Sequence, residues 1–444
     1  MSRVAVRVIP VGLAVLVVGV GIGLMSGGVA EYGDYAVLAA LGVLAVGVAV
    51  AAPRLLIALA LPATLLMARV GGVLSISDFV LALATLLSFT VIKGRDLLPM
   101  RALMWAGMAY IAASLPTVIL NPYGANVVEW IHEVVLILGS MVVGFTIGRS
   151  GQAALSAGLY VLACVGIAIA ATVAGVFQLA TEGSFGPVYL PELHKNTIGG
   201  ALAVAIVLLY ARPAWFRWPR LLSWMAIGLC VVGIAASGSR QGMVGAVVGL
   251  LVVALRRNPE TGRIRVVPWL AAIPIGIAVF TLVDDQLAED NQFNSAYQRL
   301  DWYAQTIEIW RQSPVFGVGL RWWYTGQYAA FQPPNAELEV LSSVGVVGLI
   351  GFLVMFLVAA VALWRLDPAY GTVGVAIVAT RFTQGQFDLY WVAGQASLLW
   401  IVAGICYGAL ALRDGGELHP GRFTAVPGST PEHAVHAVHA RRLA

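Results

Sequence analysis

The segment ASGSRQGMVG, residues 236–245, places Arg240 between two apolar runs that are each long enough to cross a bilayer. A helix that begins at this arginine presents backbone N–H groups without intrahelical partners and the positive end of its dipole, and Ser237 or Ser239 can cap it. A guanidinium forms paired hydrogen bonds with phosphate oxygens and keeps its charge at physiological pH. The pattern predicts a phosphate or diphosphate site at the membrane–water interface. The alternative is an arginine that reaches toward lipid headgroups.

A second arginine, Arg299, lies in the stretch AYQRLDWYAQTIEIWRQSP, which is amphipathic at helical spacing. Its apolar face is predicted to carry Leu300, Tyr303, Ile307 and Trp310, and its polar face Asp301, Gln305, Glu308 and Gln312. With further tryptophans nearby, the stretch is predicted to form a helix lying at the interface. Two guanidinium groups over one cavity suit a diphosphate. Pairing of Arg299 with Asp301 or Glu308 is the alternative.

Apolar runs of about 20 residues recur from end to end of the chain. Of its 444 residues, 60% are hydrophobic and only 11% are charged, which is more apolar surface than a soluble domain can bury. These features predict an all-α, polytopic membrane protein with about 11 to 14 transmembrane helices. The predicted spans are 8–26, 35–52, 54–70, 76–92, 101–120, 127–148, 153–180, 196–211, 221–236, 241–256, 266–283, 338–363, 369–386 and 391–412. Residues 1–412 are expected to form a single transmembrane domain, and residues 413–444 a disordered cytosolic tail.

Basic residues are divided unevenly between alternate loops. Most lie in one set, which includes residues 93–101, 212–220 and 256–265, whereas the other set holds few, with Arg240 and Arg299 among them. The positive-inside rule then places both termini in the cytosol and the second set outside. The outer side also holds one long loop, residues 284–337, which carries the amphipathic helix. The predicted phosphate-binding groups therefore lie on the outer face.

Other polar residues gather at the predicted outer ends of the spans. The segment RFTQGQFDLYW places Arg381, Gln384 and Asp388 beside aromatic residues, a composition that suits sugar binding. A re-entrant or frayed helix end with internal hydrogen bonds is the alternative. A further group, in the segment EWIHEVV, is interpreted as structural pairing and comprises Glu129, His132 and Glu133.

Three segments, in order along the chain, carry a resemblance to a known family. They are SGSRQGMVGAVVGLLV, RLDWYAQTIEIWRQSPVFGVGL and PPNAELEVLSSVGVVGLIGF. Their order, with a long outer loop between the first and the third, resembles the O-antigen ligase and O-antigen polymerase superfamily, bacterial membrane glycosyltransferases of the GT-C type. The likeness covers about residues 236–352, and HKNTIGG at 194–200 resembles an upstream family feature. The resemblance implies that Arg240 and Arg299 bind the diphosphate of a polyprenyl-linked glycan.

Family members usually carry His-Asn just before the helix that follows the long loop, where the histidine is proposed to act as the base on an acceptor hydroxyl. This chain has Pro-Asn there, at residues 334–335. Glu337 is one substitute, because partial burial makes a carboxylate more basic, although it also suits an ordinary helix-dipole partner. His194 is another, although LHKN can instead place Lys195 on a phosphate with Asn196 as the helix cap. In a third alternative, little base catalysis is needed because positioning supplies much of the rate.

The predicted function is therefore transfer of a glycan from a polyprenyl diphosphate to an acceptor hydroxyl at the outer face of the bacterial inner membrane. The acceptor is a glycan, a lipid or a protein, which leaves ligase and polymerase open. Further substrate contacts are expected from Gln241, Asn335, Glu339, Arg321, Arg381, Gln384 and Asp388.

No metal or other cofactor is expected, because arginines supply the positive charge and the chain lacks the Asp clusters that hold Mg²⁺ at diphosphates. Nucleic acid is not an expected partner. The alternative function is a transporter or flippase of lipid-linked sugars. Such a protein typically has charges at mid-membrane and two related halves, which the sequence does not display.

Overall fold

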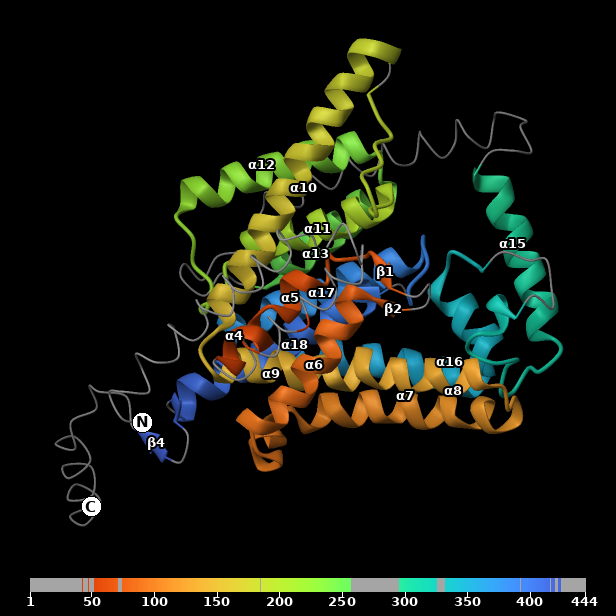
Figure 1. Cartoon of the computed structure of the whole chain (residues 1–444), viewed down its shortest axis with the longest axis horizontal. Helices are drawn as coiled ribbons and strands as arrows, with labels where there is room; N and C mark the ends of the chain where they lie inside the picture. Colours follow the sequence, from red (N-terminus) through yellow and green to blue (C-terminus); the bar gives the residue numbers. More distant parts are fainter. Residues whose placement is uncertain are drawn as a thin grey trace, which may run out of the picture.

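The computed structural model describes residues 52–70, 74–183, 185–256, 295–325, 332–391, 393–415, 417–419 and 422–424, together with Gly42 and Gly47. Helices dominate these ranges, which confirms the all-α prediction (Figure 1). Six helical segments of the described part are long and apolar enough to cross a membrane, and three shorter apolar helices accompany them. The protein is therefore a polytopic helical membrane protein.

The helices follow one another with short connections. They are α4 (Pro53–Ala58), α5 (Ala60–Ala63), α6 (Ile76–Val91), η2 (Gly94–Met100), α7 (Arg101–Leu120), α8 (Gly124–Val134), η3 (Val135–Gly139), α9 (Ser140–Arg149), α10 (Ala153–Glu182), α11 (Lys195–Ala211), α12 (Arg220–Ser237), α13 (Arg240–Leu255), α15 (Ser295–Trp310), η4 (Trp322–Tyr324), α16 (Ala336–Trp364), α17 (Pro368–Gly385) and α18 (Ala393–Gly415). Two short antiparallel ribbons complete the described structure, β1 (Arg69–Val70) with β2 (Leu74–Ser75), and β3 (Glu417–His419) with β4 (Arg422–Thr424).

From residue 76 onward, the predicted spans in the described ranges coincide with helices to within a few residues. The predicted spans at 8–26 and 266–283, and nearly all of 35–52, lie outside the described residues, as does the start of the long loop. In the predicted tail, α18 continues to Gly415 and is followed by the β3–β4 ribbon, while the remaining residues also lie outside the described ranges.

The prediction of one span at residues 54–70 is wrong. The chain there forms two short helices, α4 and α5, separated by a turn at Leu59, and then leaves into β1. Pro62 lacks the N–H that a continuous helix needs, and the Thr64 hydroxyl donates a 2.6 Å hydrogen bond to the Leu61 carbonyl, which favours the helix end. A run of apolar residues therefore does not guarantee one helix.

The centre of the bundle is the close pair of α9 and α18. Gly144 and Gly148 of α9 face Gly404 and Gly408 of α18 at four-residue spacing, and each leaves no room for a Cβ atom. A Cβ on Gly144, for example, would lie 2.0 Å from the Ile401 carbonyl oxygen. Small residues at this spacing let two membrane helices pack backbone to backbone, so this pair forms a rigid centre around which the other helices pack.

The same close approach brings the starts of α11 and α13 together. A Cβ on Gly242, in the first turn of α13, would lie 2.7 Å from the backbone of Gly199 in α11. Farther along α13, Gly249 packs against the Thr380 side chain of α17. Because α11 and α13 begin side by side, their first residues, Lys195 and Arg240, are delivered to the same end of the bundle. We call this the site end, where α11, α13 and α16 begin and α17 ends.

Helix α16 is interrupted at Gly345, which has a φ of 70° and a ψ of −171°. Such a break leaves backbone groups without helical partners, which is costly in a membrane unless other groups replace them. Residues 314–319, which we call the inserted segment, replace them. Four backbone hydrogen bonds join the two: Val318 N–H to Ser342 O (3.0 Å), Gly319 N–H to Ser343 O (2.9 Å), Val346 N–H to Pro314 O (3.0 Å) and Val347 N–H to Val315 O (3.2 Å).

Glycines make this contact possible. Gly317 and Gly345 both have positive φ angles, and a Cβ on Gly345 would lie 2.2 Å from the Val315 carbonyl oxygen. Polar residues of α7 and α8 hold the assembly from the other side, because Asn126 accepts a 2.9 Å hydrogen bond from the Leu320 N–H and Thr117 donates to the Ser343 carbonyl at 3.0 Å. The loop that carries the arginines is therefore fixed to the membrane helices by backbone contacts.

Helix α15 stands at the edge of the bundle, beside the beginning of α16 (Figure 1). Its polar face is as predicted at Asp301 and Glu308, which are exposed. The predicted apolar face is wrong in detail, because Leu300 is 56% exposed whereas Ile309 is fully buried. Ile309 packs with Val318 and Trp322 of the following loop, and this contact rotates the buried side of the helix away from the one that spacing alone predicts.

Candidate functional site

Three cations predicted to bind phosphate come together at the site end. Lys195 opens α11, Arg240 opens α13, and Arg299 lies in α15. The Lys195 ammonium interacts electrostatically with both arginines and with Asp388, and the two arginines interact with each other. Three positive groups at two helix N-termini favour an anion, because each N-terminus adds backbone N–H donors and the positive end of a dipole.

The helix caps at these termini are partly as predicted. Ser239 caps α13, since its hydroxyl oxygen accepts a 3.2 Å hydrogen bond from the Gly242 N–H, while Ser237 Oγ accepts from the Ser239 N–H at 3.3 Å. The prediction that Asn196 caps α11 is wrong. Asn196 lies inside the helix and His194 is the cap, because its backbone is extended and its Nδ1 accepts a 3.3 Å hydrogen bond from the Asn196 N–H.

This capping role defines what the His194 ring can do. Its Nδ1 faces the helix, so Nε2 is the nitrogen left to take a proton. Tyr189 contacts the ring edge-on, with the ring centroids 5.3 Å apart. Partial burial lowers the pKa of His194 below its ordinary 6.5, Asp388 opposes that shift, and the positive charge of Lys195 adds to it. His194 is therefore neutral at pH 7 and remains a candidate base.

A polar strand of contacts connects the cations with the start of α16. Gln241, next to Arg240, donates through Nε2 to Asp388 Oδ2 at 3.0 Å and to the Asn196 carbonyl at 3.1 Å. Two residues earlier in the chain, Gln386 donates to Glu337 Oε1 at 2.6 Å. The segment 386–391 thus places Asp388 beside the cations and Glu337 one step away, with the Glu337 atom Oε2 buried and without a hydrogen-bond partner among the described residues.

Asn335 joins the same strand of contacts. It caps α16, because its Oδ1 accepts a 2.9 Å hydrogen bond from the Leu338 N–H, and its Nδ2 donates to Gln386. Its neighbour Pro334 is buried where family members usually carry histidine. The predicted contact residues Gln241, Asn335 and Asp388 are therefore all brought together with Glu337 at the site end.

Arg381 and Gln384 lie deeper than predicted. Arg381 is only 2% exposed, and its Nη1 donates a 2.5 Å hydrogen bond to Gln384 Oε1. Gln384 in turn donates to the Gly200 carbonyl at 3.4 Å, and it packs against Gly245 of α13. These two side chains fill the space between α11, α13 and α17, so the structure separates them from Asp388, which is at the surface of the site.

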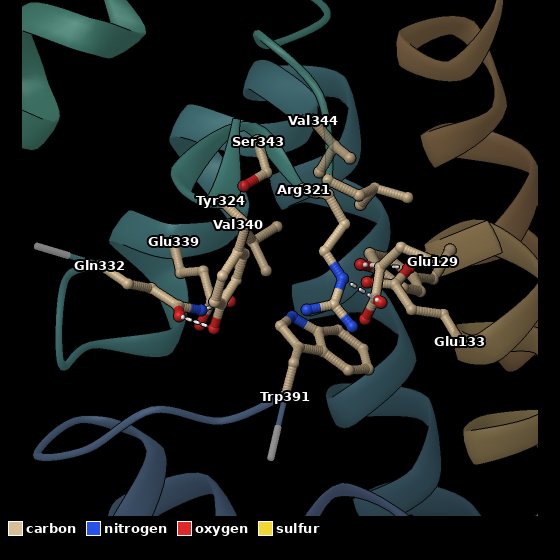
Figure 2. Close-up of a pocket in the computed structure, with 12 residues that line it drawn as sticks. Glu129, Glu133, Arg321, Tyr324, Gln332, Glu339, Val340, Ser343, Val344 and Trp391 are labelled. Carbon is tan, nitrogen blue, oxygen red and sulfur yellow. Dashed lines mark hydrogen bonds and ion pairs between the residues drawn. The ribbon is translucent and has the colours of Figure 1, made fainter. Parts of the chain in front are cut away.

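Arg321 and Glu339 lie in a second cluster, a pocket bounded by α7, α8, the start of α16 and Trp391 (Figure 2). Arg321 donates from Nε to Glu129 Oε2 at 2.7 Å, and its guanidinium lies 4.9 Å from the centre of the Tyr324 ring. Glu339 is 3% exposed and accepts a hydrogen bond from Gln332. The pocket is thus a separate, acidic and aromatic surface near the cation site.

The matching with known proteins falls on this region of the chain. Residues 224–353 match the family model described as O-antigen ligase. The chain belongs to the O-antigen ligase and polymerase family. A comparison with curated proteins finds no match. The matched ligase segment runs from α12 into α16 and therefore includes Arg240, Arg299, Arg321 and both glutamates at the start of α16.

The O-antigen ligase segment does not contain the whole site. Lys195, His194 and Asp388 lie outside residues 224–353, and the fold brings them to the segment through α11 and through the end of α17. The inserted segment and the break at Gly345 lie inside it, so the family match includes the device that fixes the loop to α16.

Sequence reasoning missed much of the pocket in this O-antigen ligase-family protein. It interpreted Glu129, His132 and Glu133 as structural pairing, and the pairing is present, with His132 Nδ1 3.4 Å from Glu129 and His132 Nε2 3.2 Å from Asp78. It did not find Arg321 as the partner of Glu129, because the two are far apart in the chain. The available signal was the presence of three acidic or imidazole groups within one apolar span, which is rare unless they pair or bind something.

Proposed function

The protein is a ligase- or polymerase-type member of its family, with a role in polysaccharide assembly. We propose that it transfers a glycan from a polyprenyl diphosphate to an acceptor hydroxyl at the outer face of the inner membrane. The observation that carries the proposal is the convergence of Lys195, Arg240 and Arg299 at two helix N-termini. This arrangement suits a diphosphate held at a membrane surface while its lipid tail remains in the bilayer.

In the proposed reaction, the acceptor oxygen forms a bond to the anomeric carbon of the donor glycan. The bond between that carbon and the diphosphate oxygen breaks, and the polyprenyl diphosphate leaves with the electron pair. Arg240, Arg299 and Lys195 stabilise the negative charge that builds on the leaving oxygen. A base removes the proton of the acceptor hydroxyl. Because the cations meet the charge only as it develops, they lower the barrier to transfer.

The distribution of charge at the opposite end of the bundle supports the proposed orientation. Arg256 donates to backbone carbonyls at residues 364 and 366, and Arg413 donates to Asp367 at 2.6 Å. These arginines belong to the basic loops that the positive-inside rule assigns to the cytosol. The cation site lies at the other end of the same helices, which supports a site on the outer face.

The experiment that tests the function follows the donor in cells of the native host, with and without the protein. Loss of a transferase leaves unused lipid-linked glycan exposed on the outer leaflet, together with loss of the polymeric product, and the chain-length pattern separates a polymerase from a ligase. Loss of a flippase leaves the same lipid on the cytosolic leaflet. Labelling with a reagent that cannot cross the membrane distinguishes the two. Accumulation on the cytosolic leaflet alone overturns the proposal.

Glu337 is the proposed base, because its carboxylate is adjacent to Asp388 through Gln386 and one of its oxygens is unpartnered among the described residues. Glu337→Gln is expected to lower the transfer rate by about 10² to 10⁴, the usual contribution of general base catalysis. His194→Gln is expected to change it far less. Glu308→Gln, which removes an exposed carboxylate on α15, is the matched control.

The pH dependence of transfer separates the two candidates. The pKa of His194 lies below 6.5, so a His194 base loses activity only as the pH falls through that acidic range, where the ring becomes protonated. In that case His194→Gln removes the acidic limb of the rate profile. A large loss in His194→Gln together with a small one in Glu337→Gln rules out the proposed assignment.

A further inference from the structure

The pocket that holds Arg321 and Glu339 has no part in binding the diphosphate (Figure 2). We infer that it binds a hydroxyl or hydroxymethyl group at the edge of a neutral sugar of the acceptor, with Glu339 accepting its hydrogen bond. The inference rests on the proposed function, because it assigns this pocket to the substrate that receives the glycan. It adds a second binding surface to the one formed by the cations.

The first observation is that two buried polar groups lining the pocket lack partners. Glu339 is 3% exposed, and its Oε1 is held by Gln332, while its Oε2 has no hydrogen-bond partner among the described residues. Ser343 is one turn farther along α16, is also 3% exposed, and its hydroxyl likewise lacks a partner within the described ranges. Buried polar groups are nearly always hydrogen-bonded, so an acceptor and a hydroxyl left open toward one pocket indicate a ligand.

The second observation is the balance of charge, which selects the kind of ligand. The positive charge of Arg321 is already engaged by Glu129 at 2.7 Å, and Glu133 accepts a 3.2 Å hydrogen bond from the Tyr110 hydroxyl. The open group, Glu339, is a carboxylate with two other glutamates in the same lining. Such a surface repels an anion and favours a neutral hydrogen-bond donor, which a sugar hydroxyl provides.

The third observation concerns the shape and the rings of the pocket. Its interior is narrow, with room for a hydroxyl or hydroxymethyl group and none for a whole sugar ring. Tyr324 is 56% exposed, so it can meet a ring that remains outside. Trp391 lines the pocket and stacks on Tyr110, with the ring centroids 5.7 Å apart. Rigid aromatic side chains with a polar tip suit the mixed apolar and polar faces of a sugar.

The fourth observation is the distance to the cation site. Asp388, which bonds to Gln241, and Trp391, which lines the pocket, are three residues apart, so their Cα atoms are at most about 11 Å apart. The backbone of Tyr390, between them, interacts with Glu339. One substrate pair can therefore reach both surfaces, with the donor diphosphate on the cations and the acceptor sugar at the pocket.

The test measures binding of methyl hexosides, and of the series in which one hydroxyl at a time is replaced by hydrogen, to the full chain in lipid nanodiscs. Saturation-transfer nuclear magnetic resonance suits such weak ligands. In the wild-type protein, removal of one particular hydroxyl is expected to weaken binding about tenfold, because that hydroxyl bonds to a charged group. In Glu339→Gln, the parent sugar and that deoxy sugar are expected to bind equally.

Glu308→Gln serves as the control, because it removes an exposed carboxylate far from the pocket lining and is expected to keep the discrimination. Ser343→Ala is the second variant, to be used if Glu339→Gln unfolds at a lower temperature, and is expected to reduce the discrimination in part. Equal binding of the whole deoxy series by the wild-type protein overturns the inference, as does full discrimination in Glu339→Gln, or tighter binding of a glucuronate than of a hexoside. Inorganic diphosphate, titrated separately against Arg240→Ala, reports on the proposed function alone.

Discussion

Replacing Arg240 or Arg299 by alanine is expected to lower the rate of glycan transfer by about 10² to 10³, the usual cost of removing one group that stabilises developing charge. Both side chains interact with Lys195, and neither can be replaced by another cation of the same shape. Arg240→Lys is expected to recover only part of the rate, because an ammonium keeps the charge but loses the paired hydrogen bonds. The measurement is the release of polyprenyl diphosphate from lipid-linked glycan.

The control for both variants is Arg311→Ala. Arg311 lies in the same loop, pairs with Glu308 at 2.6 Å, and has a side chain that is 64% exposed. A surface pair of this kind contributes little, so its loss is expected to leave transfer unchanged. If Arg240→Ala and Arg299→Ala both remain within twofold of Arg311→Ala, the cations do not bind the leaving group and the proposed mechanism fails.

Gly345→Ala is expected to lower the free energy of unfolding by about 3 kcal/mol. A residue with a side chain is strained at this positive φ, and the new Cβ would lie 2.2 Å from the Val315 carbonyl oxygen, so the inserted segment has to move. Movement breaks the backbone hydrogen bonds that complete α16. The measurement is the unfolding midpoint of the purified protein in detergent, compared with that of the wild type.

Gly228→Ala is the matched control, because Gly228 lies within α12 and a Cβ there meets no atom within 4 Å. That substitution is expected to stabilise the helix slightly, by about 0.5 to 1 kcal/mol. Equal midpoints for the two variants would mean that the break in α16 tolerates a side chain and that the inserted segment is not locked in place.

The parts of the fold that depend on local sequence were predictable. The spans from residue 76 onward follow from runs of apolar residues, and Ser239 as a cap follows from its place before Arg240. The meeting of Arg240 with Arg299 was anticipated from their residue type and from the side of the membrane assigned to them. Their partner Lys195 came from the same reasoning, and the glycine contact between α11 and α13 explains why it lies there.

The parts that depend on distant residues were not predictable. Gly345 stands in an apolar run that is typical of an unbroken helix, and only the backbone of residues 314–319 makes its break affordable. Arg321 pairs with Glu129, which is 192 residues away, so no local pattern connects them. His194 as a cap was missed because asparagine is the commoner cap and the histidine ring takes that role only when the backbone before the helix is extended.

The lock between the inserted segment and α16 has a consequence for exchange between relatives. Every backbone bond of the lock lies within residues 314–347, and α15 packs against α16, so residues 295–364 behave as one transferable cassette. The cassette carries Arg299, Arg321 and both glutamates, whereas Lys195, Arg240 and Asp388 stay with the rest of the chain. A chimaera joined at the cassette's borders thus inherits its acceptor preference from one parent and most of its grip on the diphosphate from the other.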